Sequence, residues 1–169
     1  MKYLIIAIFS LCSSLSANCQ DITGLWKGTI FNESDGKSFQ YEVLISKEKG
    51  KYTGYSHTWF NQDGKKYFGI KKVKIRTAKD GKIIIQDAEL IEDNYNAESS
   101  KKIIQLDILD FATNNDETTL DGPFVTNATR TYASLTGRVS LKKVTYSKEY
   151  SLVQYLDKNS LEYDMSFSK

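Results

Sequence analysis

Apolar and polar residues alternate along most of this chain with the two-residue period of a half-buried β-strand. Residues 39–46 show it most clearly: Tyr41, Val43 and Ile45 share one face, while Glu42 lies on the other. The same rhythm recurs at residues 104–108 and 135–142. Each of these segments predicts a strand with one face in a core and the other in water.

Short turn signals separate the alternating segments at fairly regular intervals. Asp-Gly or Lys-Gly pairs occupy residues 35–36, 49–50, 63–64, 80–81 and 121–122. Such pairs favour tight hairpins between antiparallel strands. The pattern predicts one all-β domain, a single antiparallel up-and-down barrel of about eight strands, and a sandwich is the alternative. Residues 82–93 are less regular, which a covered strand or a β-bulge would explain.

The last residues follow a different pattern. Val153 and Leu156 are spaced as on one face of a helix, so residues 147–158 predict a short amphipathic helix that Asn159 would end. Leu161, Tyr163 and the apolar residues at 165 and 167 then alternate again, which predicts one extra strand. The domain is therefore expected to be a barrel followed by a helix and a strand.

Residues 1–19 have the order of a secretory signal peptide. A positive start, an apolar run too short to span a membrane and a stretch of small residues precede Cys19. Residues 20–169, about 150 in number, would then form one exported domain in the periplasm or outside the cell. We expect attachment to a membrane only if Cys19 carries lipid, and the residues before it make a poor lipidation site.

Charge excludes one class of partner and suggests another. A net charge of +2 is too small for the strongly basic surface that is typical of nucleic-acid-binding domains. Basic residues nevertheless gather between residues 61 and 82, where Lys71, Lys72, Lys74 and Arg76 could meet anionic glycans or lipid headgroups. Solvated strand faces are the simpler interpretation of the same cluster.

Gly24-Leu25-Trp26, directly after the predicted signal peptide, resembles the Gly-x-Trp motif of the lipocalin or calycin superfamily. The resemblance extends to small exported bacterial lipocalin-like proteins. It implies that Trp26 closes one end of a barrel and that a basic side chain from the last barrel strand packs over the indole. Counting along residues 135–143 assigns that role to Lys143, so that Gly24, Trp26 and Lys143 would form a structural plug.

The same resemblance implies that the barrel binds a small hydrophobic or amphipathic ligand. Candidate ligand contacts are the apolar, aromatic or imidazole side chains predicted to face inward: Tyr41, Val43, Ile45, Tyr55, His57, Trp59, Leu106 and Ile108. His57 is also open to a simpler interpretation, as a barrel-face histidine with ordinary partners. The alternative function is a non-catalytic structural or interaction module of the cell envelope that uses the basic residues on its surface.

Catalytic and metal-binding motifs are missing from the sequence. No Gly-x-Ser-x-Gly or glycine-rich phosphate loop occurs, and a single histidine is too few for a usual zinc site. Asp87, Glu89 and Asp107 could act as paired carboxylates only if they faced inward together. We therefore expect a protein without enzymatic activity, cofactor or metal.

Overall fold

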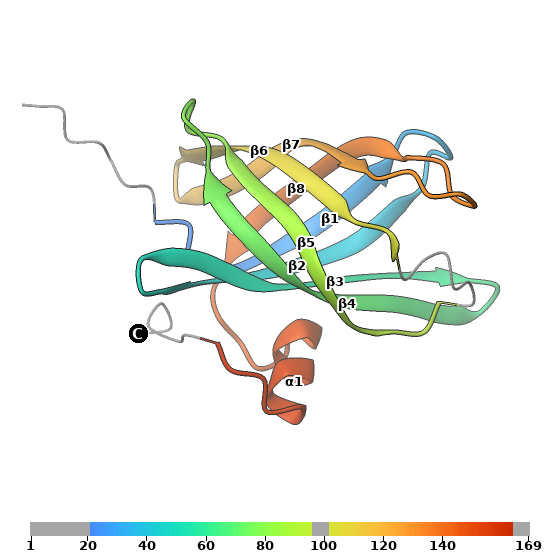
Figure 1. The fold of residues 1–169 in the computed structure, drawn as a ribbon. Coiled ribbons are helices and arrows are strands. Elements are labelled where there is room, and N and C mark those ends of the chain that lie inside the picture. Colours follow the sequence, from blue (N-terminus) through green and yellow to red (C-terminus); the bar gives the residue numbers. More distant parts are fainter. Residues whose placement is uncertain (1–20, 96–101, 164–169) are drawn as a thin grey trace, which may run out of the picture.

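The computed structural model describes residues 21–95 and 102–163, and most of them form one closed antiparallel barrel (Figure 1). Each strand pairs with its neighbours in sequence, and β1 closes the barrel by pairing with β8. The strands are β1 (Gly24–Asn32), β2 (Ser38–Glu48), β3 (Lys51–Gln62), β4 (Lys65–Thr77), β5 (Ile83–Asp93), β6 (Gln105–Asn114), β7 (Glu117–Thr126) and β8 (Thr136–Val144). The predicted barrel is confirmed.

Tight turns join most of the strands because the sequence places suitable residues there. Asp63 and Gly64 between β3 and β4 both have positive φ angles, and so do Lys49 and Gly50 between β2 and β3. Two consecutive residues with positive φ form the type I′ turn, whose twist matches that of an antiparallel pair. The turn residues therefore fix the register of these hairpins.

Two β-bulges interrupt the pairing of β4 with β5. One of them lets Lys72 pair with Glu89 and Val73 with Asp87, so that Ala88 is left out of the ladder. The irregular pattern of residues 82–93 reflects these bulges. In β5, only Ile83–Gln86 pair with β6, and the rest of β5 makes no backbone pairs with that strand.

A short helix, α1 (Ser151–Lys158), packs outside the barrel (Figure 1). Leu152, Val153 and Leu156 are fully buried against outward-facing residues of the strands, including Leu44 and Ile70. Asn159 ends the helix as predicted. The predicted extra strand is wrong for residues 161–163, which have no strand structure, and its remaining residues lie outside the described ranges.

The two ends of the barrel differ. The chain enters at the end that carries the turns after β2, β4 and β6, and the turns and loops after β1, β3, β5 and β7 lie at the opposite end (Figure 1). We call these the entry end and the open end. Within the described residues, no helix is long and apolar enough to cross a membrane.

Candidate functional site

The entry end is filled by Trp26. Its indole is fully buried, donates a hydrogen bond to the Ile22 carbonyl at 3.0 Å and meets Phe111 edge-to-face. Lys143 pairs with Trp26 across the β1–β8 ladder and holds its Nζ 5.8 Å from the indole centroid. Gly24, with a φ of +129°, leaves room for the Lys143 stem, because a Cβ there would lie 2.8 Å from Lys143 Cε. The expected contact between Trp26 and Lys143 is thus present.

Above Trp26 the interior is packed with aliphatic side chains. Tyr41, Val43 and Ile45 point inward as expected and are at most 2% exposed. Val139 and Leu141 of β8, on the far side of β1 from β2, belong to the same buried cluster. This half of the barrel is therefore a solid core.

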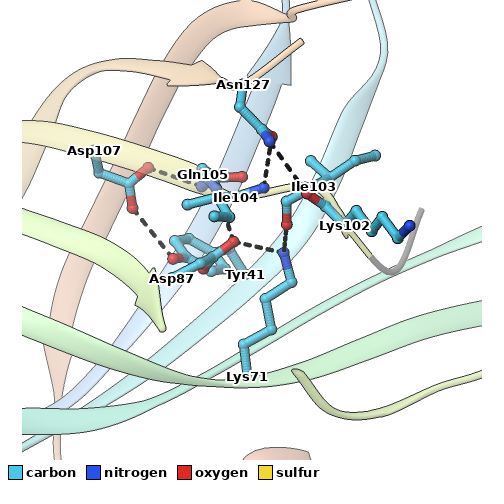
Figure 2. Close-up of polar contacts among 9 residues, drawn as sticks. All are labelled: Tyr41, Lys71, Asp87, Lys102, Ile103, Ile104, Gln105, Asp107 and Asn127. Atoms are coloured by element: carbon cyan, nitrogen blue, oxygen red, sulfur yellow. Dashed lines mark hydrogen bonds and ion pairs between the residues drawn. The ribbon is translucent and has the colours of Figure 1, made fainter. Parts of the chain in front are cut away.

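A polar cluster lies above this core, at the level of the Tyr41 hydroxyl (Figure 2). Lys71 Nζ lies 2.5 Å from Asp87 Oδ2 and donates a second hydrogen bond to the Ile103 carbonyl at 2.9 Å. Both charged side chains are largely buried, with 18% of Lys71 and 9% of Asp87 exposed. A buried ion pair is tolerated when additional hydrogen bonds satisfy its atoms, as they do here.

Asp107 forms the deeper half of the cluster. The Tyr41 hydroxyl donates to Asp107 Oδ2 at 3.2 Å, and Gln105 Nε2 donates to Oδ1 at 2.8 Å. Burial raises the pKa of the Asp107 carboxyl to about 7, an effect that the Gln105 hydrogen bond opposes and nearby Asp87 reinforces. Burial likewise raises the pKa of Tyr41 well above its usual value. Tyr41 is therefore neutral and Asp107 carries only part of a charge near pH 7.

Beyond the point where β5 and β6 stop pairing, hydrogen bonds from side chains take the place of the backbone hydrogen bonds between the two strands. The Gln105 amide donates to Asp87 Oδ2 at 2.8 Å instead of to a β5 carbonyl. Asn127, in the loop after β7, accepts from the Ile104 amide and donates to the Lys102 carbonyl (Figure 2). These bonds hold the segment that leads into β6 against the barrel and bring Ile103 and Gln105 to the rim of the interior.

A pocket of about 240 Å³ lies over the polar cluster at the open end. Lys71 and Gln105 provide its polar floor, and Tyr95 and Tyr132 come from the loops after β5 and β7. The remaining lining side chains face inward from the strands or their ends: Ile30, Asn32, Phe39, Thr58, Phe60, Ile103, Phe124, Thr126 and Leu135. The barrel is therefore filled at one end and hollow at the other.

The structure corrects the facing of β3. Val43 points inward and pairs with Ser56, so Ser56, Thr58 and Phe60 line the interior while Tyr55, His57 and Trp59 point outward. The prediction that these last three residues line the barrel is wrong. α1 and its flanking residues cover Tyr55 and His57, and Trp59 stacks on His57, a covering that the alternation of residues alone does not reveal.

His57 packs under the start of α1. Its Nδ1 lies 3.0 Å from Ser151 Oγ, and Ser151 in turn donates to Glu42 Oε2 at 3.0 Å. Glu42 also accepts the Leu152 amide at 2.9 Å. Burial, followed by the charge of Lys66, lowers the pKa of His57 to about 4, so the ring is neutral at pH 7. The serine lies between the histidine and the glutamate, which is the order of a helix cap and not of a catalytic triad.

The facing of β6 is also corrected. Asp107, Leu109 and Phe111 point inward, whereas Leu106 and Ile108 lie on the outer surface and the prediction for them is wrong. Residues 106–111 carry apolar side chains on both faces, so alternation could not decide the register. The polar cluster decides which face of β6 points inward, since only the inward position gives Asp107 its two hydrogen bonds.

One member of the predicted basic surface is also misplaced. Lys71 shares a face with Val73 and points into the barrel, while Lys72, Lys74 and Arg76 alternate with them and are exposed. This assignment could have been made from the sequence, because Lys71, Val73 and Ile75 keep the two-residue period. Most of the pocket could not, because its walls come from loops and from strand ends far apart in the chain.

Of the three acidic side chains considered as paired carboxylates, two face inward and one faces outward. The bulge at Ala88 turns Glu89 outward, so it does not share a face with Asp87 as expected. Asp87 and Asp107 do face inward, but neither lines the open-end pocket. Among residues 21–95 and 102–163, no three His, Cys, Asp or Glu side chains converge where they could hold a metal ion.

Comparison with models of known families, with curated proteins and with solved structures finds no match to this chain.

Proposed function

We propose that this chain is a lipocalin-like binding protein that holds a small hydrophobic or amphipathic molecule in the open end of its barrel. One observation carries the proposal: an interior pocket of about 240 Å³ whose lining is mostly apolar and aromatic and whose polar side chains include Lys71 and Gln105. Mostly apolar concave sites with a few placed polar groups are the usual form of small-molecule sites. The plug at Trp26 supports the lipocalin-like assignment, and export directed by residues 1–19 stays a prediction.

The pocket is supported from below. The ion pair of Lys71 with Asp87 and the bonds of Asp107 fix the floor in one arrangement, and the aliphatic core beneath them keeps it from collapsing. A preorganised site spends less free energy on ordering its side chains when a ligand binds. Binding is the function that this arrangement serves best.

The proposal is tested by titrating the full chain with the small fluorescent dye 1-naphthylamine, which has two fused rings, and following its fluorescence. We expect saturable enhancement that Thr58→Trp abolishes, because the larger side chain enters the pocket from β3. Gln40→Trp is the matched control, because Gln40 lies on the outer face of β2 at the same end of the barrel and should leave binding unchanged. Equal binding by both variants would show that the dye does not occupy the pocket.

The alternative, an interaction module of the cell envelope, rests on Lys72, Lys74 and Arg76, which share the outer face of β4. Without Lys71 the predicted surface loses one of its four members. Replacing the three exposed residues by glutamine should weaken salt-sensitive retention on a heparin column if this surface binds anions. Unchanged retention would remove the alternative.

A further inference from the structure

The size of the open-end pocket limits what it can hold. A cavity of about 150 Å³ accepts benzene, and pockets for drug-sized ligands begin at about 300 Å³. At about 240 Å³, this pocket suits one ring or two fused rings and is too small for a long acyl chain. The solid core around Trp26 prevents a longer molecule from extending toward the entry end.

The walls of the pocket favour a flat aromatic molecule. Phe39 meets Phe60 edge-to-face at 5.0 Å, and Phe60 stacks at 6.3 Å on Tyr95 from the loop after β5. Phe124 and Tyr132 complete an aromatic wall. Aromatic side chains arranged in this way can take another ring by stacking or edge-to-face contact.

The floor of the pocket offers hydrogen bonds without free positive charge. An ammonium group has three N–H donors, and the described residues accept two from Lys71, at Asp87 and Ile103. The third donor of Lys71 and the second N–H of the Gln105 side-chain amide, whose first N–H bonds Asp107, can meet a polar group of a ligand. Asp87 already neutralises Lys71, and Asp107 adds partial negative charge nearby. A carboxylate entering the pocket would therefore have to compete with Asp87 or remain unpaired, which is costly in a desolvated site.

We propose that the pocket selects compact, uncharged aromatic molecules that carry a hydroxyl or amide group, and that it rejects carboxylates such as fatty acids. The ring lies among Phe39, Phe60 and Phe124, and the polar group meets Lys71 and Gln105. This selectivity rests on the proposed binding function and narrows its ligand class.

Four probes test the selectivity by isothermal titration of the full chain at pH 7: 2-naphthol, naphthalene, 2-naphthoate and dodecanoate. We expect 2-naphthol to bind about tenfold more tightly than naphthalene, the ratio that about 1.4 kcal/mol produces. We also expect it to bind at least about tenfold more tightly than 2-naphthoate, whose charge finds no partner. Dodecanoate should bind weakest, being both long and anionic.

Asp87→Asn isolates the role of charge. Removal of the carboxylate frees the Lys71 ammonium, so binding of 2-naphthoate should tighten by about tenfold or more while binding of 2-naphthol changes only a few-fold. Glu89→Gln is the matched control, because Glu89 belongs to the same strand but faces outward opposite Lys72. It should leave the preference unchanged.

The outcomes separate the two proposals. If 2-naphthoate or dodecanoate binds unaltered protein more tightly than 2-naphthol, the selectivity is overturned while the binding function stands. If no probe binds and 1-naphthylamine also fails, the binding function itself is wrong. The ranking on unaltered protein decides the matter even if Asp87→Asn does not fold, which circular dichroism would reveal.

Discussion

At the scale of single residues, Trp26 is a structural plug. It is fully buried, bonded to Ile22 and packed on Phe111, and it does not line the open-end pocket. Gly24-Leu25-Trp26 therefore explains how one end of the barrel is closed. Ligand recognition depends on other residues.

We predict that Trp26→Ala lowers the free energy of unfolding by about 3–5 kcal/mol, because it leaves a large cavity in the core. Urea denaturation followed by circular dichroism measures the loss. A Trp26→Ala protein of unaltered stability that no longer bound 1-naphthylamine would instead place the indole in the binding site.

The cation over the indole should contribute less. Lys143→Met keeps the apolar stem and removes the charge of an exposed side chain, so we predict a loss of about 0.5–1 kcal/mol. Lys142→Met is the control, because Lys142 points outward and pairs with Glu117 at 3.0 Å. Equal losses in the two variants, measured by the same denaturation, would show that the contact with Trp26 adds nothing.

Asp107 should make stability depend on pH. Its pKa in the folded protein is about 7, above the value near 3.9 expected in an unfolded chain. Between about pH 4 and 7 the folded state therefore keeps a proton that the unfolded chain has released, so this contribution to stability falls as pH rises and levels off above pH 7.

Asp107→Asn cannot ionise and should abolish that contribution. From pH 4 to pH 8, the free energy of unfolding of unaltered protein should fall by about 2–4 kcal/mol relative to that of Asp107→Asn. Asp110→Asn, on the exposed face of the same strand, should retain the slope. Parallel pH profiles for unaltered protein and Asp107→Asn would contradict the assignment.

At the scale of elements, α1 is held to the barrel by a carboxylate from another element. The residue before the helix, Tyr150, offers no side-chain cap, and Glu42 of β2 accepts from both Ser151 and Leu152. A negative charge at the first turn also complements the helix dipole. Glu42, 1% exposed, is therefore the link between barrel and helix.

We predict that Glu42→Gln destabilises the protein by about 1–3 kcal/mol, because it removes the charge from the acceptor of the buried Leu152 amide and the half-buried Ser151 hydroxyl. Glu48→Gln serves as control, since Glu48 is exposed at the end of the same strand. Thermal unfolding of the two variants gives the comparison. If they unfold at the same temperature, the helix is not held by Glu42.

The buried face of a strand could be predicted from the sequence for some strands and not for others. Alternation oriented β2 and β8 correctly, because most polar residues of each strand lie on one face. It misplaced β3, where a helix distant in sequence covers the aromatic face, and β6, where both faces are apolar. In each case, contacts from outside the strand decide which face is buried.

At the scale of the whole molecule, the barrel combines a filled half with a hollow half. The closed order of eight strands and the plug could be predicted from turn spacing and from Gly24-Leu25-Trp26. The pocket could not, because it depends on the bulges in β5, on the early end of the β5–β6 ladder and on the loops that supply Tyr95 and Tyr132.

The most direct test of the central claim is a two-dimensional ¹⁵N–¹H spectrum of the full chain recorded during titration with 2-naphthol. The account predicts saturable shifts that cluster at the backbone amides of Thr58, Gln105, Phe124 and Thr126, which line the open-end pocket, and little change at Trp26 or Phe111. Shifts confined to the entry end or to the outer surface, or no shifts at all, would contradict it.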